Sequence, residues 1–169
     1  MTARPENHAP AIPATSADEA RRTWSALVTV YQTVLRDVVA RLEDETPLDS
    51  ATFSALAYLE RADPPGRLRL GELHRCMRVR YSQPGVSRLV QRMEADGLVE
   101  RRADPDDRRA TLLVVTRLGR ARYRRADAVY AAAVAEHFSR HVSDGEAALL
   151  AAALEDLATR LAPPPSPPV

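Results

Sequence analysis

A short helix followed at once by a β-hairpin is the feature that most constrains how this chain folds. The helical pattern runs from Ser82, a favourable N-cap, to Gly97, a residue type that ends helices in the left-handed conformation. Pro84 fits only the first turn, because proline has no amide hydrogen to donate. Apolar residues at helical spacing predict one buried face, made of Val86, Leu89, Val90 and Met93.

The opposite face of this helix carries amide, hydroxyl and guanidinium groups and no acid in its first turns. Such groups bond well to base edges and phosphate oxygens. The pattern therefore predicts a recognition helix that contacts DNA, and an ordinary solvated helix face is the alternative. The candidate contacts are Gln83, Ser87, Arg88, Gln91 and Arg92, together with the capping Ser82.

The hairpin is predicted from two strand-like segments, Leu98–Arg102 and Arg108–Thr116, which flank an Asp- and Pro-containing turn at Ala103–Asp107. A helix-turn-helix that is followed by a hairpin is the winged-helix arrangement. The segment Arg67–Leu70 alternates polar and apolar residues, so it is a candidate third strand beside this wing.

Taken in order, these motifs resemble the MarR (multiple antibiotic resistance regulator) family of transcriptional regulators. With the flanking helices, the similarity extends over roughly residues 20–161. The matching motifs are Glu72-Leu73, Ser87-Arg88-Leu89-Val90-x-Arg92-Met93-Glu94, Gly97-Leu98-Val99-x-Arg101, Asp104-Pro105-x-Asp107-Arg108-Arg109-Ala110 and Thr116-x-x-Gly119.

The resemblance implies a mainly α fold with a small β-hairpin wing (α+β), a winged helix-turn-helix with long N- and C-terminal dimerisation helices. It implies a homodimeric repressor on a pseudo-palindromic operator in double-stranded DNA, modulated by a small-molecule effector. In the wing it implies that Asp107 orients an arginine and that Arg108 or Arg109 reaches the minor groove. Strand alternation puts these two arginines on opposite faces, and we favour Arg108. A winged-helix protein-interaction module without sequence-specific DNA binding is the alternative function.

Two departures from the family bear on the recognition helix. The turn Arg78–Tyr81 is about two residues longer than is usual in the family, and Pro84-Gly85 replaces small hydroxyl residues. The helix therefore begins either at a Ser82 cap or at Pro84 with Gln83 as its cap.

Charge is segregated along the chain. The formal net charge is only +1. Residues 67–125, however, hold 16 arginines against 7 acidic residues, while the segments on either side are net acidic. A basic segment that coincides with the predicted recognition helix and wing favours nucleic-acid binding.

The remaining sequence divides into tails and dimerisation helices. Proline-containing tails are expected at residues 1–18 and 162–169, around a single domain at 19–161. Its DNA-binding part spans about residues 48–116, and the dimerisation helices span about 19–44 and 117–161, the latter interrupted near residue 140. Asp49, Thr116 and Ser143 are the predicted caps of the second, fifth and sixth helices.

Other candidate sites are weaker. Trp24, Tyr31 and Tyr58 are candidate effector-binding residues on aromatic character alone, with core packing as the alternative. Cys76 is the only cysteine and is expected to be a structural thiol. His137 and His141 share a helix face near Glu136, but two histidines are too few for a metal site.

No nucleophile–base pair, phosphate loop or carboxylate dyad occurs, so neither catalysis nor a cofactor is predicted. The sequence has no apolar run of about 18 residues and no signal-peptide pattern, so a cytoplasmic protein is expected.

Overall fold

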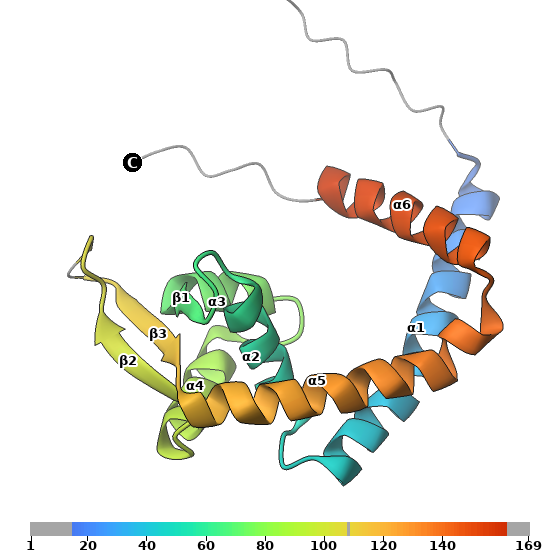
Figure 1. Cartoon of the computed structure of the whole chain (residues 1–169). Coiled ribbons are helices and arrows are strands. Elements are labelled where there is room, and N and C mark those ends of the chain that lie inside the picture. The colour runs from blue at the N-terminus through green and yellow to red at the C-terminus, as the bar shows by residue number, and fades with distance from the viewer. Residues whose placement is uncertain (1–14, 108, 162–169) are drawn as a thin grey trace, which may run out of the picture.

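The computed structural model describes residues 15–107 and 109–161. Most of the predicted N-terminal tail, the whole predicted C-terminal tail and Arg108 lie outside the described residues. The predicted fold class is confirmed, because the described chain is mainly helical with one small antiparallel sheet (Figure 1). No helix among the described residues is long and apolar enough to cross a membrane.

Helix α1 (Ala17–Glu45) begins at a Ser16 cap, whose hydroxyl accepts a hydrogen bond from the Glu19 amide at 3.2 Å. Its two halves differ in burial. Val38 and Leu42 in the C-terminal half are buried, whereas Trp24 in the N-terminal half is 66% exposed. The apolar stripe predicted from the sequence is therefore only half covered within one protomer.

Three helices and a sheet enclose the main core. Helix α2 (Ser50–Arg61) is capped by Asp49, and α3 (Leu70–Met77) and α4 (Gln83–Ala95) follow it. Their inward side chains meet those of the sheet in one cluster, which includes Leu56, Leu59, Leu73, Met77, Val86, Leu89, Val90, Met93, Leu98, Val99 and Leu113. The inward side chains of α2, α3 and α4 are thus buried together, as predicted for α4.

The wing is a three-stranded antiparallel sheet in the order β1-β3-β2. Strand β3 (Thr111–Val115) pairs on one side with β2 (Val99–Ala103) and on the other with β1 (Arg67–Arg69). The predicted third strand is confirmed. The connecting loop is longer than the predicted turn, and it closes through hydrogen bonds from the Asp104 amide to the Ala110 carbonyl and from the Ala110 amide to the Asp107 carbonyl.

Helix α5 (Arg117–His137) begins directly against the end of α4. The Thr116 hydroxyl accepts from the Gly119 amide at 3.0 Å and donates to the Gly97 carbonyl at 2.6 Å. The Thr116 amide donates to the Leu98 carbonyl at 3.0 Å. Figure 1 shows α5 running from the wing to the far end of the molecule, where it packs against α1.

The C-terminal region differs from the prediction in two respects. Helix α5 ends at His137 rather than at Arg140, because Phe138 leaves the helical conformation and a 3-10 turn, η1 (Ser139–His141), follows. Helix α6 (Asp144–Leu161) has the predicted Ser143–Glu146 capping box but no buried residue. The predicted bundle of the first, fifth and sixth helices is therefore not complete within one protomer.

Candidate nucleic-acid interface

The structure settles where the candidate recognition helix begins. The Ser82 hydroxyl accepts from the Gly85 amide at 3.3 Å, so Ser82 is the cap and Pro84 lies in the first turn. The helix is followed by Gly97 at φ +67°, where a side chain would be strained. Both ends of α4 are thus set by the residues that the sequence pattern indicated.

Burial of one side of α4 leaves a polar stripe on the other. Gln83, Arg88 and Gln91 are exposed on this side. Gln83, Ser87 and Gln91 are four residues apart in succession, so they follow one another along a single face. No hydrogen bond or ion pair within the described residues engages the Arg88 guanidinium. The positively charged Arg88 guanidinium therefore lies beside this stripe without a partner among the described residues.

Ser87 is half-buried and has a protein partner. Its Oγ lies 3.2 Å from Nε2 of His74, which comes from α3. The sequence predicts an outward or oblique position for His74, and in the structure it is half-buried against α4. Sequence reasoning missed this contact because the two residues are on different helices, and no local spacing rule relates them.

Arg92, unlike Arg88, has a partner within the protein. Its guanidinium lies 2.6 Å from a carboxylate oxygen of Asp49. The other Asp49 oxygen accepts from the Thr52 amide at 2.7 Å and caps α2. One carboxylate therefore caps α2 and also holds the last turn of α4 against it, so Arg92 is already engaged within the protein.

The base of the wing contains a buried carboxylate that sequence reasoning did not single out. Asp104 is 4% exposed, and its carboxylate accepts from Nε of Arg69 at 2.5 Å and from the Asp106 amide at 2.9 Å. These bonds, the Arg69 bond first, lower the pKa of Asp104. An aspartate that bonds to the amide two residues on is a common turn signal, but its arginine partner is 35 residues away.

Asp107 occupies the outer part of the wing loop. Its side chain accepts from the backbone amide of Arg109 at 2.9 Å, which shapes the loop around that arginine. Arg109 is exposed. The favoured minor-groove residue, Arg108, lies outside the described residues. The two arginines of β2 are paired, Arg101 with Glu94 and Arg102 with Glu100.

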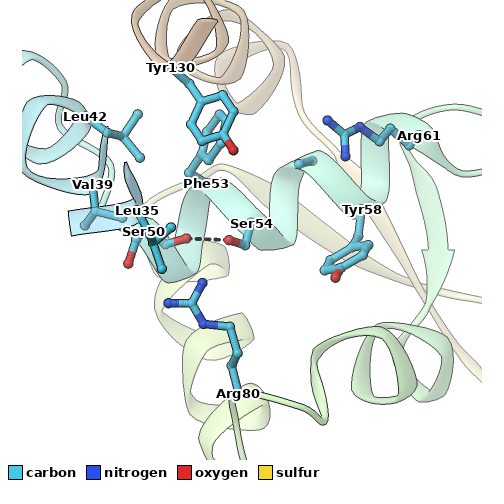
Figure 2. A pocket seen from close by; sticks show the side chains of 11 residues that line it. Leu35, Val39, Leu42, Ser50, Phe53, Ser54, Tyr58, Arg61, Arg80 and Tyr130 are labelled. Atoms are coloured by element: carbon cyan, nitrogen blue, oxygen red, sulfur yellow. Dashed lines mark hydrogen bonds between the residues drawn. The ribbon is translucent and has the colours of Figure 1, made fainter. Parts of the chain in front are cut away.

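Two open pockets lie beside α2. The first, of about 170 Å³, has an apolar lining from α1, α2 and α5 (Figure 2). Figure 2 shows Arg80 extending from the lengthened turn toward the start of α2. The second, of about 310 Å³, is lined in part by Tyr31, Tyr58 and Arg80. The structure thus brings Tyr31 and Tyr58 together, while Trp24 lines neither pocket.

The remaining candidates form no site. Cys76 is exposed rather than structural, and local burial of its thiol raises its pKa, which is opposite to the trend of reactive cysteines. His137 lies with Nδ1 3.9 Å from a carboxylate oxygen of Asp37. Residues 15–107 and 109–161 contain no group of three His, Cys, Asp or Glu side chains that would hold a metal ion.

Comparisons with known proteins agree with this architecture. Residues 46–110 match the model of the MarR family. No curated protein matches the sequence. Three solved structures are similar over most of the chain, and all three proteins are MarR family transcriptional regulators.

The first of these, AbsC from Streptomyces coelicolor, is 23% identical with a TM-score of 0.72, over 89% of this chain and 98% of AbsC. Sco3205 from the same organism, solved in complex with DNA, is 21% identical with a TM-score of 0.73, over 89% of this chain and 96% of Sco3205. The regulator from Silicibacter pomeroyi is 28% identical with a TM-score of 0.68, over 87% of this chain and 100% of its own. These matches confirm the predicted MarR resemblance and winged-helix fold.

Proposed function

We propose that this chain, whose residues 46–110 match the MarR family, is a sequence-specific DNA-binding transcriptional regulator and acts as a homodimeric repressor. The observation that carries the proposal is the exposed face of α4, which has no acidic residue in its first turns, beside a basic wing. Gln83, Arg88 and Gln91 are available for base edges, and Ser82 for a phosphate at the helix N-terminus. The related Sco3205 was solved in complex with DNA, which supports the proposal.

The other candidate residues have separate roles in this proposal. Ser87 contacts DNA from the middle of the polar stripe. Arg92 contributes positive potential while it remains bound to Asp49. Either Arg109 or, as the sequence favours, Arg108 would reach the minor groove next to the half-site, where the negative potential attracts arginine.

Dimer formation is proposed from the uncovered apolar side chains of α6. Leu149, Leu150, Leu154 and Leu161 are between 43% and 74% exposed in one protomer. A second copy that covers these side chains together with the exposed half of α1 would complete a helical bundle. The two α4 helices would then lie one turn of DNA apart, so half-sites are expected about 10 bp apart.

Effector control is proposed from the position of the pockets. Tyr58 and Arg80 line both of them, and Arg80 belongs to the turn that leads into α4. A small molecule bound beside these residues would change the position of α4 relative to α2. The proposed action on chromosomal DNA implies a cytoplasmic location and no catalytic role.

The test is fluorescence anisotropy with the gene's own upstream DNA and a scrambled duplex of the same composition. We expect preference for the upstream DNA, with a loss of about 10³-fold in affinity between 50 and 200 mM salt if about six phosphates are contacted. Arg88→Ala should weaken specific binding by about 5- to 150-fold, the equivalent of one bidentate contact. Arg36→Ala, at an exposed arginine in the C-terminal half of α1, is the matched control.

Equal, salt-sensitive binding of parent and Arg88→Ala to both duplexes would contradict sequence-specific recognition and favour the protein-interaction alternative. Dimerisation is tested by sedimentation. Leu154→Arg should give monomers and weak DNA binding, because each half-site then binds one protein independently. Ala152→Arg, on the opposite side of α6, should remain dimeric.

A further inference from the structure

The contact between His74 and Ser87 joins a titratable side chain to the middle of the proposed base-contacting stripe. Ser87 lies between Gln83 and Gln91 on one face of α4, next to Arg88. Its Oγ is 3.2 Å from Nε2 of His74, and both side chains are half-buried. The hydroxyl that faces DNA therefore already has one hydrogen-bond partner inside the protein.

Whether Nε2 of His74 carries a hydrogen decides how Ser87 can bond to DNA, and we take the neutral tautomer with its hydrogen on Nδ1 as the state of the free protein. A hydroxyl has one hydrogen to donate and two lone pairs that accept. When Nε2 carries no hydrogen, Ser87 donates to it and can only accept from DNA. When the imidazole is protonated, Nε2 donates to Oγ, and the hydroxyl hydrogen is free for an acceptor such as a guanine O6 or N7 atom or a phosphate oxygen.

Charged groups of α3, β1 and the wing loop line a pocket together with His74. These groups are Glu72 and Arg75 of α3, Arg69 of β1, and Asp107 and Arg109 of the wing loop. Arg88 adjoins Ser87 on α4. Several of these charges are balanced within the protein, because Arg69 pairs with Asp104, and Arg75 lies 3.7 Å from Glu72.

Bound DNA adds the phosphate charge to this otherwise balanced surface. A negative potential favours the protonated imidazole, and histidine is the side chain that changes charge between about pH 5 and 8. DNA binding and proton uptake at His74 are thus linked, and each favours the other.

We infer that His74 is a positioning residue for Ser87, and that the proton it takes up when DNA binds turns the Ser87 hydroxyl into a hydrogen-bond donor toward the operator. The inference rests on the proposed function, since it concerns the same DNA-binding surface. It adds a specificity-determining residue on α3, outside the recognition helix, and it makes operator affinity depend on pH. The proton that His74 takes up comes from solvent, and no other covalent bond forms or breaks.

The experiment measures operator affinity from pH 5.5 to 8.0 at constant ionic strength, using the full chain and a duplex selected from a random library. Between pH 8.0 and 5.5 we expect the parent Kd to fall by about 3- to 10-fold per half-site, below the limit of about tenfold per pH unit for one proton. His74→Gln keeps a hydrogen-bonding side chain without a titrating ring and should flatten the profile. His137→Gln, at a histidine on α5, should keep it.

A second readout uses operators with each base pair of the half-site changed in turn. Ser87→Ala and His74→Gln should lose discrimination at the same base pair, and the double variant should lose no more than Ser87→Ala alone. Urea unfolding of the free proteins at pH 7 establishes that each variant is folded. Ser87→Ala provides the test if His74→Gln does not fold, since the part of the pH dependence that acts through the hydroxyl is then lost and the profile should be shallower than that of the parent.

Three results would overturn the inference: an unchanged pH profile in His74→Gln, an unchanged profile in Ser87→Ala, or loss of discrimination at different base pairs. Any of these, with specific binding intact, leaves the proposed function standing. If the parent protein selects no duplex at any pH, the proposed function itself fails, and the inference fails with it.

Discussion

Replacing Gly119 with alanine tests how closely α5 must approach the end of α4. Gly119 is the third residue of α5 and follows the Thr116 cap. A Cβ built at this position would lie 2.1 Å from the Leu98 carbonyl oxygen and 2.9 Å from its carbon, whereas ordinary contacts begin at 3.4 Å. Both contacts are with backbone, so no flexible side chain can move aside.

The expected loss of stability follows from what must shift. Relief of the clash moves α5 away from Leu98 and strains two hydrogen bonds of Thr116, those to the carbonyls of Leu98 and Gly97. Each bond contributes about 0.5–1.5 kcal/mol, and overpacking costs about 1–3 kcal/mol. The better helix propensity of alanine returns about 1 kcal/mol. We expect Gly119→Ala to lower the free energy of unfolding by about 1–5 kcal/mol.

The assay is urea unfolding followed by circular dichroism, at one protein concentration because a dimer's stability depends on it. Gly71→Ala and Gly145→Ala are matched controls, since each is the second residue of a helix and a Cβ there meets nothing within 4 Å. Helix propensity alone predicts that all three variants gain stability. If Gly119→Ala is as stable as the controls, the close approach of α5 to Leu98 is not a constraint and the reasoning is wrong.

Two further predictions concern carboxylates that join distant segments. Asp49→Ala should lower the free energy of unfolding by about 1 kcal/mol or more, because the α2 cap is lost. Asp49→Asn should lose only the exposed ion pair with Arg92, about 0–1 kcal/mol. Thermal or urea unfolding of the two variants in parallel measures the difference, and equal losses would contradict it. For Asp104, the bond from Arg69 lowers the folded-state pKa, so its stabilising contribution is present above the unfolded-state value of about 3.9 and is lost as the pH falls through the lower folded-state value. Asp104→Asn should therefore be less stable than the parent at pH 7, with a gap that narrows below about pH 4 in urea unfolding; a gap independent of pH would exclude this ion pair as its source.

These predictions share a structural cause. In addition to the buried core, a few polar groups of the winged-helix unit join two elements at once. Asp49 caps α2 and binds Arg92 of α4, and Thr116 caps α5 while it bonds to the residues that end α4. The position of the candidate recognition helix therefore depends on contacts with α2 and α5 as well as on its own buried face.

The sequence alone determined most of the local structure. The caps at Asp49, Thr116 and Ser143 were predicted, as were the buried face of α4 and the glycine that ends it, and Ser82 was one of two predicted caps of α4. These features depend on residues within about four positions of one another, so their spacing is sufficient evidence. The third strand at Arg67–Arg69 was found from alternation in the same way.

Only the tertiary structure distinguished among side chains that the sequence left equivalent. The candidate contacts of α4 looked alike in the sequence, yet in the fold Arg88 is uncommitted among the described residues, Arg92 is bound to Asp49, and Ser87 is bonded to His74. The partners lie 43 and 13 residues away, on other helices. No periodicity relates residues at such separations, because their distance in space is set by how the helices pack, and packing depends on the whole core at once.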